Sequence, residues 1–175
     1  MRPTGRIRNS ESRLSPMNEF RLSSGDLLRI REKREDDGDA IGAMLERCGE
    51  KTYYYFHPYE LGHESGLAVA RDSEILCHLA LYMADDVVGY VWLEQLNRDV
   101  PTLGICVVDD WQGRGVGRHL MQISIEVARS VEKTGVRLTV NQDNARGQAL
   151  YQKVGFVRTR EVDGRFPSYE MRLNF

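Results

Sequence analysis

The pattern of apolar and polar positions divides the chain into short segments with the periods of strands and helices. Apolar and charged residues alternate in the first such segment, which predicts a half-exposed strand. Two later apolar runs flank Ala84, Asp85 and Asp86, and this arrangement predicts a β-hairpin with a tight turn. The strands predicted in this part of the chain are residues 27–34, 75–83, 87–96 and 102–108.

Apolar residues recur at steps of three and four in other segments, which predicts amphipathic helices. The helix that follows Gly115 is the best defined, and Gly135 is its expected C-cap. Asn144 and Gly155 are the expected N-cap and C-cap of the last helix. The predicted helices are residues 35–48, 61–71, 116–133 and 145–154, and the final strands are residues 136–140, 156–162 and 168–174. The predicted order is therefore β-α-α-β-β-β-α-β-α-β-β.

Composition indicates one globular domain. The chain has 175 residues, of which 41% are hydrophobic and 29% charged, as in ordinary soluble domains. We assign the domain to residues 25–175. Residues 1–24 begin with several arginines and no apolar run, so we expect a disordered or over-extended N-terminus, with Met17 as an alternative start. This start excludes a secretory signal and leaves an organelle transit peptide open.

Charge and cysteine content exclude several classes of function. The net charge of −2 and the isoelectric point near 6.1 indicate neither a nucleic-acid partner nor a membrane surface. No segment reaches the ~18 consecutive apolar residues of a membrane span. Cys48, Cys77 and Cys106 are odd in number and widely spaced, which argues against a disulfide framework and a zinc site. We expect buried thiols, no metal and a cytoplasmic location.

A glycine-rich junction gives the first sign of chemistry. An apolar strand runs into Gln112-Gly-Arg-Gly-Val-Gly117, and a helix follows. Glycines at alternate positions let backbone N–H groups converge, and the helix start adds unpaired donors, so the junction suits a phosphate. Arg118 and His119 after the last glycine exclude a P-loop, and Arg118 stands where a dinucleotide fingerprint needs glycine. A tight structural connection is the alternative.

A second motif lies downstream, in Asn144-Ala-Arg-Gly-Gln-Ala-Leu-Tyr-Gln-Lys-Val-Gly-Phe156. Together the two stretches resemble the GNAT superfamily of acyl-CoA N-acyltransferases. The resemblance implies an α/β fold with a central, mostly antiparallel mixed sheet that splays at the cofactor strand. It also implies acetyl-CoA as the co-substrate. The matching positions are Gln112, Gly115, Gly117, Asn144, Leu150, Tyr151, Lys153, Gly155 and Phe156.

The same resemblance implies roles for individual residues. The glycine turn would hold the coenzyme A pyrophosphate, and the backbone of residues 106–108 would pair with pantetheine and polarise the thioester carbonyl. Tyr151 would protonate or hydrogen-bond the leaving thiolate, and packing against the core is its alternative role. Asn144 would bond the pantetheine arm, cap its helix, or do both. The implied cofactor-binding residues are Cys106, Val107, Val108, Gln112, Gly113, Arg114, Gly115, Val116, Gly117, Arg118, Asn144 and Tyr151.

The general base is less well defined by the sequence. Many relatives carry glutamate ten residues before the motif glutamine, where this chain has Thr102, which cannot take up a proton at neutral pH. Glu94 on the adjacent strand is our catalytic candidate, and His57 and His78 are alternatives. An acceptor that arrives as a neutral amine would need no base.

The expected acceptor is a primary amine, either a small molecule, a protein N-terminus or a lysine side chain. The aromatic run Tyr53–Tyr59 either covers one end of the core or lines the acceptor pocket. Analogy suggests a homodimer. A non-catalytic acyl-CoA sensor is the alternative function, against which Tyr151 argues. A domain for another phosphate ligand is a further alternative, against which the second motif argues.

Overall fold

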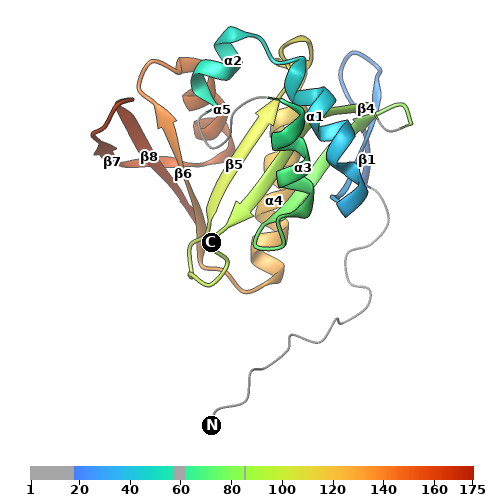
Figure 1. The fold of residues 1–175 in the computed structure, drawn as a ribbon. Coiled ribbons are helices and arrows are strands. Elements are labelled where there is room, and N and C mark those ends of the chain that lie inside the picture. The colour runs from blue at the N-terminus through green and yellow to red at the C-terminus, as the bar shows by residue number, and fades with distance from the viewer. Residues whose placement is uncertain (1–17, 57–61, 85) are drawn as a thin grey trace.

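The computed structural model describes residues 18–56, 62–84 and 86–175, which form an eight-stranded sheet flanked by helices (Figure 1). The strand order is β1-β2-β3-β4-β5-β6-β8-β7, and only β5 and β6 are parallel neighbours in the described sheet. The strands are β1 (Asn18–Arg21), β2 (Leu27–Glu32), β3 (Leu76–Tyr82), β4 (Asp86–Glu94), β5 (Thr102–Val107), β6 (Gly135–Asn141), β7 (Val157–Val162) and β8 (Ser168–Asn174). The helices are η1 (Glu35–Asp37), α1 (Gly38–Glu46), α2 (Glu50–Tyr55), α3 (His63–Arg71), η2 (Asp109–Trp111), α4 (Val116–Ser130) and α5 (Ala145–Val154).

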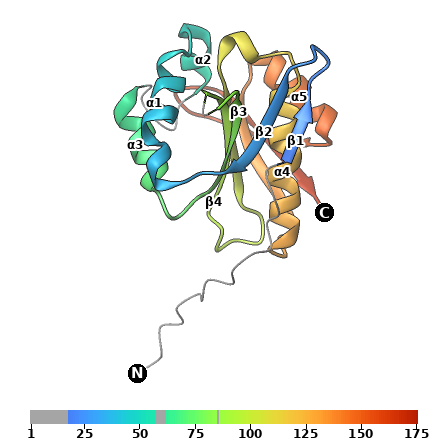
Figure 2. The same ribbon diagram turned by 90° about the vertical axis from the view of Figure 1, so that its right-hand side faces the viewer.

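Helices cover both faces of this sheet. The helices α1 and α3 pack together over one face, and α4 and α5 lie on the other (Figure 2). This mixed α/β architecture with a mostly antiparallel sheet confirms the predicted fold class. Among the described helices, none combines the length and the apolar character that a membrane crossing requires.

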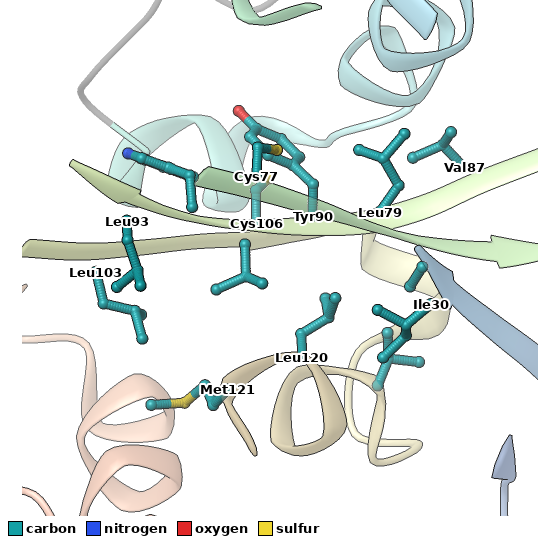
Figure 3. Packing of buried hydrophobic residues seen from close by; sticks show 14 of the residues in the cluster. Ile30, Cys77, Leu79, Val87, Tyr90, Leu93, Leu103, Cys106, Leu120 and Met121 are labelled. Atoms are coloured by element: carbon teal, nitrogen blue, oxygen red, sulfur yellow. The ribbon is translucent and has the colours of Figure 1, made fainter. Parts of the chain in front are cut away.

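Side-chain alternation along the central strands divides the core between the two faces. Tyr90 and Cys106 are register partners on β4 and β5, and their side chains point to the same face (Figure 3). Leu93 and Leu103 are also partners and point to the opposite face, where Leu120 of α4 lies. All five side chains are buried, and each large apolar one contributes roughly 1.5–3 kcal/mol of transfer free energy.

The strands β5 and β6 diverge, as the resemblance implies for the strand that enters the glycine turn. Within the described residues they share one register pair, Thr102 with Arg137, beside which the Arg137 N–H donates to the Pro101 carbonyl at 3.0 Å. Strand β6 instead pairs along its whole length with β8. Figure 1 shows β5 and β6 separating from this point toward α2 and α5. One edge of β5 is therefore left unpaired over most of its length.

The described residues include a strand on the N-terminal side of the expected boundary at residue 25. Residues 18–21 form β1, which pairs with β2 through a turn closed by the Leu22 N–H donating to the Asp26 carbonyl at 2.9 Å. The Phe20 ring stacks on His119 of α4 at 4.0 Å between centroids, and Leu22 is buried. These contacts come from distant segments, so the composition of residues 18–24 did not indicate a strand.

The end of α4 also differs from the prediction. The helix ends at Ser130, and Glu132 adopts a positive φ of 58° while the Lys133 N–H donates to the Ala128 carbonyl at 3.0 Å. This is the hydrogen-bond pattern that a C-terminal glycine usually provides. Gly135 is instead the first residue of β6, where an added Cβ would lie 2.4 Å from the Leu173 carbonyl oxygen. Gly135 therefore allows β6 and β8 to approach closely and does not cap the helix.

The segment after β2 is more divided than predicted. The acidic residues 35–37 form the separate turn η1, and α1 ends at Glu46, so Cys48 lies in the following loop. The aromatic run begins in a short helix, α2, whose six residues are too few for a periodic signal. Residues 57–61 of that run and of the next predicted helix lie outside the described residues, as does Asp85 of the predicted hairpin turn.

Candidate active site

A cavity of about 490 Å³ occupies the space where β5 leaves β6. Its walls come from α2, from β5, from the glycine turn (Gln112–Gly117) with the start of α4, and from α5. The cavity thus brings together both sequence motifs and part of the aromatic run. Its lining residues are Lys51, Thr52, Tyr55, Phe56, Ile105, Cys106, Val107, Gln112, Gly113, Gly115, Gly117, Arg118, Asn144, Arg146, Gly147, Ala149, Leu150, Tyr151 and Lys153.

The glycine turn needs its glycines for different reasons. Gly113 and Gly115 have φ values of 79° and 99°, a region that other residues rarely adopt. Gly117 lies inside α4, where an added Cβ would sit 3.2 Å from Leu150 Cδ2 and so fill the cavity. Gly115 is the N-cap of α4, so the first backbone N–H groups of the helix have no helical acceptor. This arrangement can bind a phosphate group.

Gln112 ties the turn to three other elements. Its Nε2 donates to the Val107 carbonyl at 2.9 Å and to Thr52 Oγ1 at 2.8 Å. Its Oε1 accepts from Arg146 Nη1 at 3.0 Å. Because these bonds engage both ends of its amide, Gln112 holds the turn against β5, α2 and α5.

The free backbone groups of β5 differ from those predicted. The Val108 N–H donates to the Val88 carbonyl at 3.1 Å, and the Cys106 carbonyl oxygen faces Gly89, so both point to β4. Peptide groups alternate in an antiparallel pair, so the groups of Ile105 and Val107 point to the open edge. The backbone groups of Cys106 and Val108 therefore face β4 and not the open edge, whereas Cys106 still lines the cavity, and cofactor binding by these residues stays a prediction.

Tyr151 lies in the cavity on α5, as its predicted role requires. Burial, together with the nearby Cys106, raises the pKa of the Tyr151 hydroxyl to about 12. Within the described part of the chain, no group is hydrogen-bonded to this hydroxyl. The side chain is consequently a protonated donor available to a ligand.

Asn144 both caps α5 and lies at the cavity. Its Oδ1 accepts from the Gly147 N–H at 2.9 Å, which caps α5, and the residue also lines the cavity. By contrast, the side chains of Arg114 and Val116 face away. Arg114 lies 3.8 Å from Asp26 and stacks over Trp111, and Val116 is buried in the core. Only their backbone groups remain candidates for ligand contact.

Two of the proposed general bases, Glu94 and His78, do not line the cavity. Glu94 pairs with Thr102 at the end of β4 and is not part of the lining. His78 is 6% exposed, and burial lowers its pKa to about 4. His57 lies outside the described residues. Among the described lining residues there is no aspartate, glutamate or histidine.

Among the cations around the cavity, sequence reasoning assigned Arg118 to the cofactor and gave no role to Lys51, Arg146 or Lys153. Arg146, Leu150 and Lys153 follow helical spacing, which places them on one face of α5. That spacing was readable from the sequence and would have identified two of these basic residues. The cationic lining residues are Lys51, Arg118, Arg146 and Lys153. They match a ligand with several negative charges.

The described residues of the aromatic run both cover the core and line the cavity, and contact with an acceptor stays a prediction. Phe56 is buried and packs edge-on against Tyr90 and Trp92, with centroids 6.2 and 6.0 Å apart. Tyr55 lines the cavity, and its hydroxyl donates to the Asp143 carbonyl at 3.3 Å. The described residues contain no group of three or more potential metal ligands.

The fold is that of an α/β domain with a cavity at a splayed strand, beside a glycine turn that can bind phosphate. The family model described as "Acetyltransferase (GNAT) family" matches residues 43–156, more than half of the chain. The chain belongs to this family, which confirms the resemblance in the two motifs.

Individual relatives agree with this assignment. N-alpha-acetyltransferase RimI of Mycobacterium tuberculosis is 37% identical over 132 residues, which cover 67% of this chain and 78% of that protein. Mycothiol acetyltransferase of Jonesia denitrificans is 34% identical over 88 residues, 49% of this chain. The match spans only 28% of that mycothiol enzyme's length. The GNAT domain of S. lividans PAT superposes with a TM-score of 0.82 at 17% identity, covering 91% of this chain and 97% of that domain, which supports the fold.

Proposed function

We propose that this chain transfers an acetyl group from acetyl-CoA to a primary amine by direct attack. The observation that carries the proposal is the protonated Tyr151 hydroxyl, which lies in one cavity with the glycine turn and the open edge of β5. Phosphate binding, thioester positioning and leaving-group protonation need these three features side by side. Family membership gives the donor class, since the family uses acetyl-CoA.

The residues present fit acetyl-CoA. The start of α4 and the cations Arg118 and Arg146 would hold the phosphates, because converging N–H groups and guanidinium groups bind phosphate oxygens strongly. The Ile105 peptide groups and the Val107 N–H would pair with the pantetheine amides as a neighbouring strand does, while the Val107 carbonyl already accepts from Gln112. Gln112 keeps the turn and β5 in register, so it acts as a positioning residue.

The chemistry asks for one bond to form and one to break. The amine nitrogen bonds to the acetyl carbon, and the carbon–sulfur bond breaks. A backbone N–H at the open edge of β5 polarises the carbonyl, a contribution typically worth about 3 kcal/mol. Tyr151 gives its proton to the departing sulfur, and the proton that the amine loses returns to the phenolate directly or through water. Charge is balanced without a metal.

The amine has to arrive neutral. No described lining residue is a carboxylate or an imidazole, so the cavity offers no conventional base. The fraction of neutral amine is then set by the pKa of the acceptor itself. Glu94 stays a prediction for a base that acts through water from the end of β4.

A panel of amines tests the proposal. Purified protein and acetyl-CoA would be mixed with a polyamine, an alanine-starting peptide and a lysine-containing peptide, and thiol release would be followed. We expect release with one acceptor class, and a large loss in Tyr151→Phe. Tyr53→Phe is the matched control, because Tyr53 is 51% exposed and outside the cavity lining.

A non-catalytic acyl-CoA sensor is the second candidate, and the missing carboxylate in the described lining favours it. Such a protein would bind acetyl-CoA and coenzyme A, and no amine in the panel would release thiol above the rate without protein. Acetyl transfer to any acceptor that depends on Tyr151 excludes this alternative.

A further inference from the structure

Two cysteines far apart in the sequence meet at the edge of the cavity. Cys48 Sγ lies 3.9 Å from Cys106 Sγ, although 58 positions separate them. Cys106 is fixed in β5 and lines the cavity, whereas Cys48 lies in the loop between α1 and α2. Cys77 and Cys106 are buried as expected, whereas Cys48 is partly exposed.

The two sulfur atoms are close enough that a small movement would let them form a covalent bond. A disulfide requires sulfurs about 2.05 Å apart, so the two atoms need to approach by roughly 2 Å. The Cys48 loop can supply this movement, since it follows the end of α1 and precedes the short helix α2. Cys106 sits in a strand that is fully paired on its β4 side, so the loop would move toward the strand.

We propose that Cys48 and Cys106 form a reversible disulfide when the protein meets a peroxide, and that this bond lowers turnover. The bond would draw the loop before α2 onto β5. Helix α2 supplies Lys51, Thr52 and Tyr55 to the cavity wall, so its displacement narrows the space beside Tyr151. The effect on turnover rests on the proposed acetyl transfer, whereas the formation of the bond does not.

The pKa values of the two thiols are shifted in opposite directions, and disulfide formation needs one thiolate and one resolving thiol. A hydrogen bond from Cys106 lowers the pKa of Cys48, with a smaller contribution from Arg47, although burial and Asp109 act in the opposite direction. The same contact with Cys48, together with burial, raises the pKa of Cys106 well above its usual value. Cys48 is therefore the attacking thiolate and Cys106 the resolving thiol.

The chemistry balances with peroxide as the oxidant. The Cys48 thiolate attacks one peroxide oxygen, the oxygen–oxygen bond breaks, and the thiolate becomes a sulfenic acid while a proton and hydroxide leave as water. The Cys106 thiol then attacks the Cys48 sulfur, a disulfide forms, and the sulfenic oxygen leaves as a second water. Two electrons pass from the two sulfurs to the peroxide. A dithiol reductant reverses the bond.

Cys77 provides an internal control. It is 1% exposed, and burial raises the pKa of its thiol to about 12, so it should not react. Full-length protein would be treated with hydrogen peroxide and digested without reduction. We expect one linked peptide pair that contains Cys48 and Cys106, absent in Cys48→Ser and present in Cys77→Ser. Failure to find this pair, or its persistence in Cys48→Ser, would overturn the site.

Turnover tests the second half of the inference. Oxidised wild type and Cys77→Ser should lose at least tenfold of their thiol-release rate and regain it with dithiothreitol, while Cys48→Ser should keep its rate throughout. Equal rates for linked and reduced wild type would reject the regulatory effect. If neither form transfers acetyl groups, the proposed function fails, yet the linked peptide still decides whether the disulfide site exists.

Discussion

Tyr151 is the residue on which the chemistry depends most directly. Its hydroxyl stays protonated over the physiological range, because burial and Cys106 raise its pKa to about 12. We predict that Tyr151→Phe lowers kcat by about 10²-fold, the usual range for a positioned acid, and changes acetyl-CoA affinity less than about twofold. Stopped assays of thiol release and calorimetry measure the two quantities. Equal kcat in wild type and variant at every pH would remove Tyr151 from the mechanism.

The pH dependence follows from the residues that line the cavity. Because no described lining residue is a carboxylate or imidazole, kcat/KM should rise with pH as the acceptor amine loses its proton, and level off at the pKa of that amine. Two acceptors of different pKa should give profiles displaced by the difference between their pKa values. A rising limb at the same pH for both acceptors would instead assign a base to the protein, with Glu94 the first candidate to replace.

For individual residues, the sequence predicted which residues lie at the cavity better than it predicted where their groups point. The glycine turn, Asn144 and Tyr151 all lie at the cavity, because local motifs determine them. The Val108 N–H and the Arg114 side chain point away from the cavity, since the register of β5 against β4 and the contact with Asp26 decide where they point. Those partners are distant in the chain and leave no local signal.

Gly117 tests the assignment of the start of α4. Its φ is negative and it lies in a helix, so a larger residue causes no backbone strain, but an added side chain meets Leu150, Ile105 and Val107 inside the cavity. We predict that Gly117→Leu keeps the melting temperature and weakens acetyl-CoA binding by about tenfold or more, ~1.4 kcal/mol.

The matched control for that variant is Gly164→Leu, at a position with open space around it in the β7–β8 loop. Calorimetry and thermal melting measure both proteins. Wild-type affinity in Gly117→Leu would show that the ligand does not use this end of α4.

The turn η1 carries an ion pair that should control acid stability. Arg31 contacts Asp37 with two hydrogen bonds of 2.7 and 2.6 Å, and both side chains are largely buried. Burial acts to raise the pKa of Asp37, but the bonds from Arg31 and from the Arg34 N–H lower it overall. The carboxylate therefore stabilises the fold above the pKa of an unfolded aspartate, about 3.9, and the contribution is lost as pH falls through the lower folded value.

We predict that Asp37→Ala lowers the free energy of unfolding by about 3 kcal/mol at pH 7, because the largely buried Arg31 loses its two hydrogen bonds to a carboxylate. The difference from wild type should shrink below about pH 4, where the aspartate of the unfolded chain takes up a proton, and should vanish below the lower pKa of the folded state. Urea unfolding at several pH values measures this, with the exposed Asp36→Ala as control. A difference that stays constant down to acid pH would contradict the ion-pair explanation.

Elements whose apolar positions repeat regularly were predicted well, but the residues at which those elements end were not. The apolar positions of α4 repeat over its whole length, so its core is readable from sequence. The helix ends where Glu132 adopts a left-handed conformation. Glycine usually occupies such a position, so the sequence predicts the end of the helix at Gly135. Helix α2 is too short for a periodic pattern, and packing of Phe56 on Tyr90 and Trp92 anchors its end.

On the scale of the whole molecule, the order of elements was sufficient to predict the sheet, with β1 as the exception. That edge strand is stabilised by Phe20 on His119 and by burial of Leu22, both tertiary contacts. We predict that a chain starting at residue 25 melts roughly 5 °C or more below one starting at residue 18, since losing a buried leucine and a strand costs about 2 kcal/mol or more. Equal melting temperatures would mean that β1 contributes nothing to stability.

Binding of acetyl-CoA to the cavity is the claim on which the proposed function depends. Calorimetric titration of the whole protein with acetyl-CoA, followed by coenzyme A alone, tests it most directly. We predict one site of about micromolar affinity for both ligands, weakened about tenfold or more in Gly117→Leu and unchanged in Gly164→Leu. No heat of binding from either ligand in the folded wild type would mean that the glycine turn is only a structural connection. That result would also contradict the proposed acetyl transfer.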